Sequence, residues 1–470
     1  MYCTEYIDIP PKLVRTAQIF SRNGFCVYLV GGAVRDVLLG KEASDYDLAT
    51  DATPQDVSRI FRKVIPTGIA HGTVTVHYAG LSLEVTTFRS EGTYSDGRHP
   101  DSVVFAHTIE DDLSRRDFTM NAIAASLPSG KLVDPAGGRG DIERKTIRAV
   151  GNPLERFAED GLRPVRAIRF ASQLGFSIDE ATHSAILNPH VFEKTKLVST
   201  ERFRDEFCKI LLTPKPSVGL RLLEEAGILG FFVPQFTPCR GCTQVDSRGF
   251  HAFDVADHLF SATDGAATGN LIVRIAAFYH DMGKPDARTV EQTQQGQCIH
   301  FHGHDRLSAI TAEQSMRALK FSNAEVRKVS HLVRHHMINC DPSLSDEDIR
   351  RFIVRVGKDN LDELFLLHEA DVYGKHGKVP DEGSKETREF SRFKARVQDA
   401  LSSPMVFSLK DLAVSGDDLI ASGVPHGKQV GKILDELFDA TTHDPAINEH
   451  DALLDLAHRL LLQHQVAQRS

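Results

Sequence analysis

Two carboxylates that can share metal ions stand close to a glycine turn near the N-terminus. Asp45 and Asp47 alternate along a predicted strand, so both side chains face the same way. The preceding strand runs into Gly31 and Gly32, whose backbone can approach a phosphate while Arg35 neutralises its charge. Each feature alone is more typical of an ordinary turn or loop. Together they indicate nucleotidyl transfer, in which one Mg²⁺ activates the attacking hydroxyl and another holds the triphosphate.

A site of this type usually has a third acidic group on a neighbouring strand. Glu84 is the candidate, because it interrupts the apolar run of residues 81–85. A carboxylate within an apolar strand is costly unless it is paired or metal-bound. We therefore expect Glu84 to join Asp45 and Asp47 as a catalytic residue, with a salt bridge at the strand end as the alternative.

A second group of metal-ligating residues lies in the middle of the chain, where 11 of the 22 histidines fall between His251 and His376. The adjacent His-Asp pair on an apolar helix resembles the HD phosphohydrolase superfamily. The resemblance implies metal ligation by His258, His280, Asp281 and Asp371, with His304 and one of His335 or His336, here His335, completing a two-metal site. Such ligands suit Mn²⁺, Fe, Co²⁺ or Ni²⁺.

The elements that must position these residues divide the chain into unlike parts. Residues 27–39, 72–78 and 81–88 predict short strands, and residues 54–64 predict a helix. Helical patterns dominate from residue 153 onwards. The predicted fold class is α+β, with a small mixed-sheet nucleotidyltransferase head followed by an all-helical neck, an HD domain and a tail. The expected boundaries are 1–150 for the head, 151–240 for the neck, 241–400 for the HD metal-binding domain and 401–470 for the acidic tail.

Six ordered segments of the first part carry a specific family resemblance. They are YLVGGAVRDVLLG (28–40), DYDLAT (45–50), HGTVTV (71–76), EVTTFRSEGTYSDGRHPDSVVF (84–105), EDDLSRRDFTMNAIA (110–124) and ERFAEDGLRPVRAIRFASQLGF (155–176). This stretch resembles the class II tRNA nucleotidyltransferase and bacterial poly(A) polymerase family, and is most similar to its CCA-adding members. The resemblance implies template-independent addition of C, C and A from CTP and ATP to the 3′ end of tRNA, with Mg²⁺ as cofactor.

The resemblance also implies which side chains recognise the nucleotide. It assigns Arg116 to the incoming nucleotide and makes Asp160 and Arg163 a protein template for the base. A carboxylate accepts from the exocyclic amine that cytosine and adenine share, and a guanidinium donates to the acceptor beside it. The full expected nucleotide-binding set is Gly32, Arg35, Arg116, Asp160, Arg163, Arg166 and Arg169.

Local patterns give three expectations about how these residues are held. Residues 115–117 are expected to open a helix, and Asp160 and Arg163, three apart, to share one helical face. Pro164 fits such a helix only in its first turn, because it lacks a backbone N–H. The polar segment 89–100 resembles the loop that complete CCA-adding enzymes use between C and A addition, which favours full CCA addition or terminal A addition.

The charge distribution indicates where an RNA partner can bind. The net charge is −9, but residues 341–470 carry −8 of it, so we expect tRNA to contact the head and neck. The N-terminus lacks the pattern of a signal peptide, and no run approaches the roughly 18 apolar residues of a membrane span. A cytoplasmic protein with no membrane association and no obligatory protein partner is expected. Cys239 and Cys242 form a close pair for which a zinc or redox role is the less favoured interpretation.

Other functions remain open from the sequence alone. An enzyme that adds only the terminal A, or a poly(A) polymerase, shares the whole head. From another class, the chain can be a metal-dependent phosphohydrolase with an RNA-binding head, although the retained Asp45, Asp47, Arg116 and Asp160 argue against it. The HD domain itself can act on nucleotide or RNA-end phosphates, or only shape tRNA binding.

Overall fold

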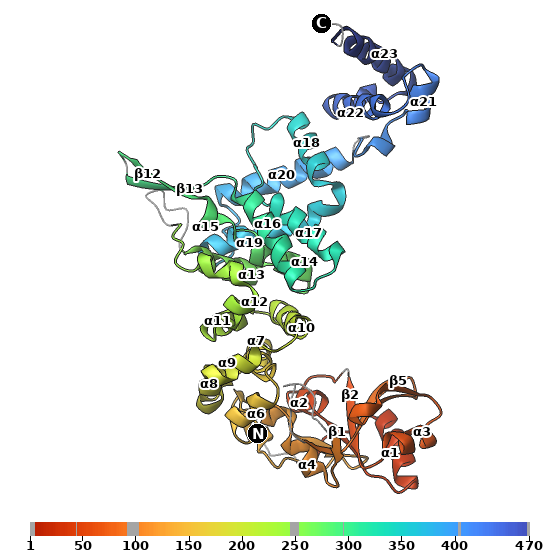
Figure 1. Ribbon diagram of the computed structural model, residues 1–470, viewed down its shortest axis with the longest axis vertical. Coiled ribbons are helices and arrows are strands. Elements are labelled where there is room, and N and C mark those ends of the chain that lie inside the picture. Colours follow the sequence, from red (N-terminus) through yellow and green to blue (C-terminus); the bar gives the residue numbers. More distant parts are fainter. Residues whose placement is uncertain are drawn as a thin grey trace. The chain divides into compact units, whose positions relative to one another are not determined.

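The computed structural model describes residues 5–43, 45–91, 103–244, 253–294, 296–402 and 406–467. These residues form two compact units, one of residues 1–237 with 318–320, the other of residues 238–317 with 321–470 (Figure 1). The α+β class predicted from the sequence is confirmed, with a sheet near the N-terminus and helices in most of the remainder. The four-part division stays a prediction. Most of the polar segment 89–100 lies outside the described residues.

A mixed sheet of seven strands forms the head within the first unit. Its order is β3 (Val64–Gly68), β4 (Thr73–Tyr78), β5 (Leu81–Thr87), β2 (Tyr46–Thr50), β1 (Val27–Val30), β8 (Ala124–Ser126) and β9 (Leu132–Val133). Strands β2 and β5 are parallel, and every other neighbouring pair is antiparallel. The parallel pair aligns Asp47 with Glu84, and the β1–β2 pair aligns Asp47 with Val30. The register thus brings two of the three predicted acids together.

For two segments of the head, the predicted secondary structure differs from the observed one. Residues 27–39 are not one broken strand, because β1 ends at Val30 and helix α2 (Gly32–Leu38) follows. Gly31 makes the turn with φ of 71°, and Val34 packs at 0% exposure. The helix predicted over 54–64 ends earlier, since α3 spans Pro54–Ile60. Its next residue, Phe61, has an extended backbone and packs on Phe20 with ring centroids 5.3 Å apart.

The helices after the head meet at a turn that presents the predicted base template. Helix α6 (Pro153–Glu159) ends at Asp160, and α7 (Arg163–Leu174) begins three residues later. Gly161 at this turn packs so closely that an added Cβ would lie 2.3 Å from the Lys194 carbonyl oxygen. Helix α10 (Thr200–Leu211) packs on α7 and contributes buried phenylalanines at 203 and 207.

The second unit is mainly helical, and its innermost helix is nearly apolar. Helix α14 (Leu271–Tyr279) is surrounded by α13 (Val255–Gly265), α17 (Asn323–Arg334) and α19 (Leu361–His376). Further along the chain, α20 (Lys385–Leu401) precedes a small cluster with its own core, which includes Leu419, Ile433 and Leu453. No described helix is long and apolar enough to cross a membrane.

Candidate active site and metal centre

The acidic end of the β2–β5 pair lines a polar cavity of about 340 Å³ in the first unit. Asp47 and Glu84 line it from the sheet, and Asp45 immediately precedes β2. Burial raises the pKa of Asp47, and the Asp45 carboxylate raises it further against the lowering effect of Arg116. Burial and Asp47 likewise raise the pKa of Glu84. Arg116 lowers the pKa of Asp47 and Arg89 lowers that of Glu84, but burial outweighs both arginines. The all-oxygen donor set of these carboxylates fits Mg²⁺.

The other walls of the cavity carry the guanidinium groups predicted for nucleotide binding. The cavity is lined by Val30, Asp47, Leu48, Thr73, Glu84, Thr86, Arg89, Arg115, Arg116, Asp117, Asp160, Leu162, Arg163, Arg166 and Arg202. Carboxylates on one side and arginines on the other suit a ligand that carries both metal-bound phosphates and a base. Four of the predicted site residues do not line the cavity, namely Gly32, Arg35, Asp45 and Arg169.

The glycine turn approaches the acidic residues closely. A Cβ at Gly31 would lie 3.1 Å from Arg116 Nη1 and 3.7 Å from Asp47 Oδ2, so the turn requires glycine for space as well as for its positive φ. Arg35 is buried rather than presented to the cavity, because its guanidinium donates to Asn121 Oδ1 at 2.9 Å and to the neighbouring Asp36. A direct phosphate contact by Arg35 stays a prediction.

The sequence predicted that residues 115–117 open a helix. In the structure they follow one instead. Helix α4 (Ile109–Ser114) ends just before Arg115. Its buried Asp112 accepts from Arg115 at 2.6 Å and from Arg116 at 3.2 Å, and so aims both guanidinium groups. The helix begins at Ile109, before the predicted start, because the Thr108 side chain caps it by accepting a hydrogen bond from the backbone N–H of residue 111.

Asp117 anchors the first turns of the neck to the head. Its carboxylate accepts from Arg166 at 2.6 Å and from Asn121 at 3.2 Å. Burial alone would raise the pKa of Asp117, but the Arg166 guanidinium outweighs burial and lowers the pKa to about 2. Asp117 is therefore an anion at every physiological pH.

Asp160 and Arg163 do not share one helical face, which corrects the sequence prediction. Asp160 has an extended backbone at the end of α6, with φ of −141°, whereas Arg163 is the first residue of α7. Pro164 falls in the first turn of α7, where it costs no helical hydrogen bond. Both template side chains still line the cavity, because the turn between the helices brings them there.

Each template side chain is fixed by hydrogen bonds, and that of Asp160 has a partner on another helix. Asp160 Oδ2 accepts from Arg202 of α10 at 2.6 Å, and its Oδ1 accepts from the Leu162 N–H at 2.9 Å. Arg163 donates to the Arg156 carbonyl at 2.8 Å and also contacts Glu159. Sequence reasoning missed Arg202, because no local spacing connects it with a residue 42 positions earlier.

Arg169 lies deeper in the neck than predicted. It donates to Glu206 at 2.8 Å and to Gln173 at 2.6 Å, and its guanidinium stacks on the Phe170 ring at 3.6 Å. These contacts hold α7 against α10, so Arg169 supports the walls of the cavity from behind.

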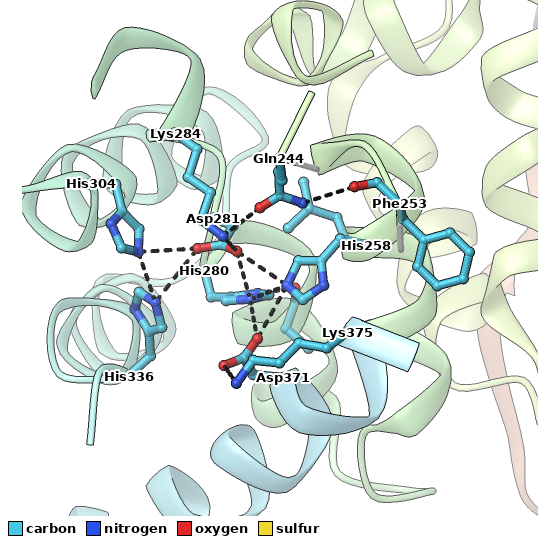
Figure 2. Close-up of polar contacts among 12 residues, drawn as sticks. Gln244, Phe253, His258, His280, Asp281, Lys284, His304, His336, Asp371 and Lys375 are labelled. Carbon is cyan, nitrogen blue, oxygen red and sulfur yellow. Dashed lines mark hydrogen bonds and ion pairs between the residues drawn. The ribbon is translucent and has the colours of Figure 1, made fainter. Parts of the chain in front are cut away.

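The second unit brings six histidine and aspartate side chains together (Figure 2). His258 Nε2 lies 3.0 Å from His280 Nε2, and both face Asp281 Oδ2 and Asp371 Oδ1 at 3.1–3.4 Å. The other oxygen of Asp281 faces His304 Nε2 at 3.3 Å and His336 Nε2 at 3.6 Å. The members come from α13, the end of α14, α16 (His304–Ala318), the end of α17, and α19. Asp281 thus lies between two ligand groups, and can bridge two ions.

The hydrogen bonds of the imidazoles show that this arrangement fits metal ions. Nδ1 of His280, His304 and His336 lies 2.7–2.8 Å from a backbone carbonyl three residues earlier in the chain. A carbonyl only accepts, so each Nδ1 carries the proton and each neutral ring turns the lone pair of Nε2 inward. Lone pairs of nitrogen and carboxylate oxygen converging in a buried space repel one another unless a cation lies between them. In the absence of a cation, two effects on the pKa of His280 compete. Burial lowers this pKa, but the carboxylates of Asp281 and Asp371 outweigh burial and raise it to about 10.

The structure corrects one member of the predicted ligand set. His336 lies in the cluster, whereas the ring of His335 packs against His331 at a centroid distance of 4.6 Å. The reason is that α17 ends at Arg334, and the turn after it directs only the second histidine inward. Burial and neighbouring cationic groups lower the pKa of His335 to about 4.

Two lysines surround the cluster and were not found from the sequence. Lys284 is buried and lies 2.6 Å from both Asp281 Oδ2 and Gln244 Oε1. Lys375 lies 3.6 Å from Asp371 Oδ2 on the other side (Figure 2). Lys284 follows the His-Asp pair by three residues, a spacing that could have signalled it. In the described parts of the chain, Cys239 and Cys242 join no such ligand group.

The fold and these two sites define a class of protein, a nucleotidyltransferase of the poly(A) polymerase type joined to an HD-type metal centre. Family models match in the same order along the chain. They are the poly A polymerase head domain (27–148), a probable RNA and SrmB-binding site of polymerase A (175–239), the HD domain (248–374) and a putative tRNA nucleotidyltransferase domain 2 (373–457). Both catalytic domain types imply dependence on divalent metal.

Comparison with whole proteins narrows the class to one family. The CCA-adding enzyme of Geobacillus sp. strain WCH70 is 34% identical, over 96% of this chain and 98% of the relative. The CCA-adding enzyme of Lactobacillus johnsonii is 32% identical, over 92% of this chain and 93% of the relative. The crystal structure of the Bacillus stearothermophilus CCA-adding enzyme with CTP matches with a TM-score of 0.72 and 28% identity, covering 98% of this chain and 100% of that one. The chain belongs to the family of CCA-adding enzymes.

Proposed function

We propose that this chain adds C, C and A from CTP and ATP to the 3′ end of tRNA. The observation that carries the proposal is a single cavity lined by metal-binding carboxylates, Asp47 and Glu84, and by the base-template pair, Asp160 and Arg163. Membership of the CCA-adding family supports it, as does the B. stearothermophilus relative, whose structure contains CTP. A nucleotide bound here is selected by side chains and needs no template strand.

The chemistry is transfer of a nucleotide to the terminal ribose. The 3′ hydroxyl of tRNA gives its proton to solvent as its oxygen bonds to the α-phosphorus. The bond between the α-phosphorus and the oxygen that bridges the α- and β-phosphates breaks, and pyrophosphate leaves with that oxygen. Asp45, Asp47 and Glu84 would hold Mg²⁺, which would supply hydroxyl activation and charge neutralisation at the leaving pyrophosphate. Arg116, aimed by Asp112, stabilises negative charge on the phosphates.

The base is chosen at the opposite wall. Hydrogen bonds from Arg202 and from the Leu162 N–H fix the orientation of the Asp160 carboxylate, so its remaining lone pairs point in fixed directions. An exocyclic amine, on cytosine or adenine, donates to it, whereas uracil and guanine present a carbonyl there. Arg163 donates to the ring acceptor next to the amine. The tRNA acceptor end contacts the head and neck, because residues 341–470 carry most of the net negative charge.

The test is incorporation of each labelled nucleotide into tRNAs that end before CCA, after the first C and after CC. Addition of C, C and then A, followed by arrest, is the expected result. Incorporation of A only, and only on the CC-ended tRNA, would replace the proposal with an A-adding enzyme. Long A tracts on unrelated RNA would replace it with a poly(A) polymerase.

We also propose that the HD centre is a metal-dependent phosphohydrolase or phosphodiesterase. Its donor set of imidazoles and carboxylates suits Mn²⁺, Fe, Co²⁺ or Ni²⁺, and Asp281 can bridge two such ions. Lys284, 2.6 Å from Asp281, adds a positive charge for a phosphate. The test is hydrolysis of phosphate esters by metal-free protein reloaded with each ion in turn. A centre that binds metal and hydrolyses nothing has only a structural role.

A further inference from the structure

An apolar cavity of about 510 Å³ in the second unit belongs to neither site described so far. It lies between α19 and α20, next to the segment that joins them. Its walls comprise Gly265, His368, Glu369, Val372, Tyr373, Val379, Pro380, Glu382, Glu386, Thr387, Phe390, Ser391 and Lys394. Its volume is within the range of pockets that enclose small molecules.

The inner wall of this cavity is aromatic. The rings of His368 and Phe390 lie 4.3 Å apart at an angle of 36°, and both residues are less than a tenth exposed. Tyr373 adds a third ring to the lining, and Val372 closes the floor. Burial lowers the pKa of His368, so this imidazole is neutral at physiological pH. A neutral, flat aromatic wall favours a planar ring system that can stack on it.

The rim of the cavity is acidic. Glu369, Glu382 and Glu386 line it, and Lys394 is its only lysine or arginine. Lys394 is engaged, because its Nζ lies 3.0 Å from Glu369 Oε1 and above the Phe390 ring. The rim therefore offers acceptors for a ligand that carries N–H donors at the edge of its ring. Planar rings with such donors are nucleobases with an exocyclic amine.

The cavity is connected with the metal centre through a half-buried lysine. Lys375 Nζ lies 3.3 Å from Glu386 on the cavity rim and 3.6 Å from Asp371 in the metal cluster. His368 on the cavity wall precedes Asp371 by less than one turn of α19. A ligand whose ring occupies the cavity can therefore place its polar end near Asp371 and Lys375.

We propose that this cavity binds the base of a mononucleotide and is the base subsite of the HD centre. The assignment rests on the phosphohydrolase function proposed above and adds to it the class of substrate. It predicts preference for adenine, cytosine or guanine over uracil, because uracil has no exocyclic amine for the glutamates.

The experiment measures nucleoside binding directly, by saturation-transfer difference NMR on the full chain with adenosine, cytidine, guanosine and uridine. Ser391→Phe fills the cavity from its exposed edge, and Ala395→Phe adds the same ring one turn along α20, outside the lining. Asp160→Ala removes base recognition in the head. We expect signals for the three amine-bearing nucleosides that fall at least fivefold in Ser391→Phe and persist in Ala395→Phe and Asp160→Ala. Equal signals in Ser391→Phe and wild type, or loss in Asp160→Ala alone, would overturn the proposal.

Hydrolysis then separates this proposal from the one it rests on. With metal loaded, Ser391→Phe is expected to raise KM for adenosine monophosphates at least fivefold and to leave p-nitrophenyl phosphate hydrolysis unchanged. An equal loss on both substrates contradicts a base subsite. If the wild type hydrolyses neither substrate, the phosphohydrolase proposal is wrong. The cavity is then not the base subsite of a hydrolytic centre, even if the NMR signals show that nucleosides bind.

Discussion

The two candidate metal sites of this chain are built in opposite ways. In the head, Asp47 and Glu84 stand at exposed strand positions in a cavity that also contains arginines, Asp45 lies just before β2, and all three offer only oxygen. In the second unit, imidazoles and carboxylates from five segments converge in a space where His258 and His280 are fully buried. The first arrangement suits an ion that arrives and leaves with a triphosphate, and the second suits an ion that stays.

The two sites also differ in where the substrate would bind relative to the metal. In the head, Asp47 and Glu84 share one cavity with the side chains that we propose bind the base and the phosphates, so substrate and metal would be held together. The HD cluster is closed by its own ligands, and the cavity beside it is a separate space connected through Lys375. Substitutions in one site should therefore leave the other unchanged.

The largest expected effect comes from Asp47→Ala. Removing the carboxylate that faces both Glu84 and Arg116 should lower CTP incorporation into tRNA at least about a thousandfold, or about 4 kcal/mol of transition-state stabilisation. Single-turnover kinetics with labelled CTP measure it. Glu42→Ala, an exposed acid just before the same strand, is the control and should keep the wild-type rate. A rate for Asp47→Ala within tenfold of wild type would contradict the role of this carboxylate.

The adjacent histidines of the HD centre offer a matched pair. His336→Ala removes a ligand that faces Asp281, whereas His335→Ala removes a ring that packs on His331. Elemental analysis of protein loaded with Mn²⁺ should give about two ions per chain for wild type and His335→Ala, and about one for His336→Ala. The opposite pattern would show that His335 is the ligand.

Asp117 tests how firmly the head holds the neck. Its pKa of about 2 lies below the unfolded value of about 3.9, so its stabilisation is present in full above that value and is lost as the pH falls toward 2. Asp117→Asn should lower the unfolding free energy by about 2 kcal/mol at pH 7, and by about half that at pH 3. Hydrogen exchange of the β1 and β2 amides measures it. An equal loss at both pH values would mean that the charge contributes nothing.

The smallest effect is expected at Arg202, which positions Asp160 without belonging to the predicted template. Arg202→Met should reduce the preference for CTP over UTP about tenfold, since the carboxylate then samples more orientations. The ratio of kcat/KM values for the two nucleotides measures it. Arg204→Met, on the same helix but paired with Asp205, serves as control. An unchanged ratio in Arg202→Met would show that Asp160 is fixed by the backbone alone.

The sequence was informative where chemistry leaves a local pattern. An acid within an apolar strand identified Glu84, which the structure aligns with Asp47. The shared face of Asp45 and Asp47 stays a prediction, because β2 begins only at Tyr46. The α+β class followed from the change of periodicity after residue 150. The convergence of His258, His280 and Asp281 was expected from the resemblance, although no spacing alone could establish it.

The errors lie where tertiary contacts decide the local structure. The helix after Gly31 has only seven residues, too few for a clear periodic signal. Whether His335 or His336 faces the cluster depends on the residue at which α17 ends, and ends of helices are poorly defined by sequence. The partner of Asp160 lies 42 residues away on another helix, a relation that only the folded chain reveals.

We propose that the chain contains two independent metal sites, of which only the one in the head performs CCA addition. The most direct measurement is the stepwise incorporation of C, C and A by Asp281→Asn, in Mg²⁺ alone, beside elemental analysis of the same preparation. We predict wild-type addition of all three nucleotides together with loss of both ions from the HD cluster. Loss of nucleotide addition in a folded Asp281→Asn protein would contradict the claim.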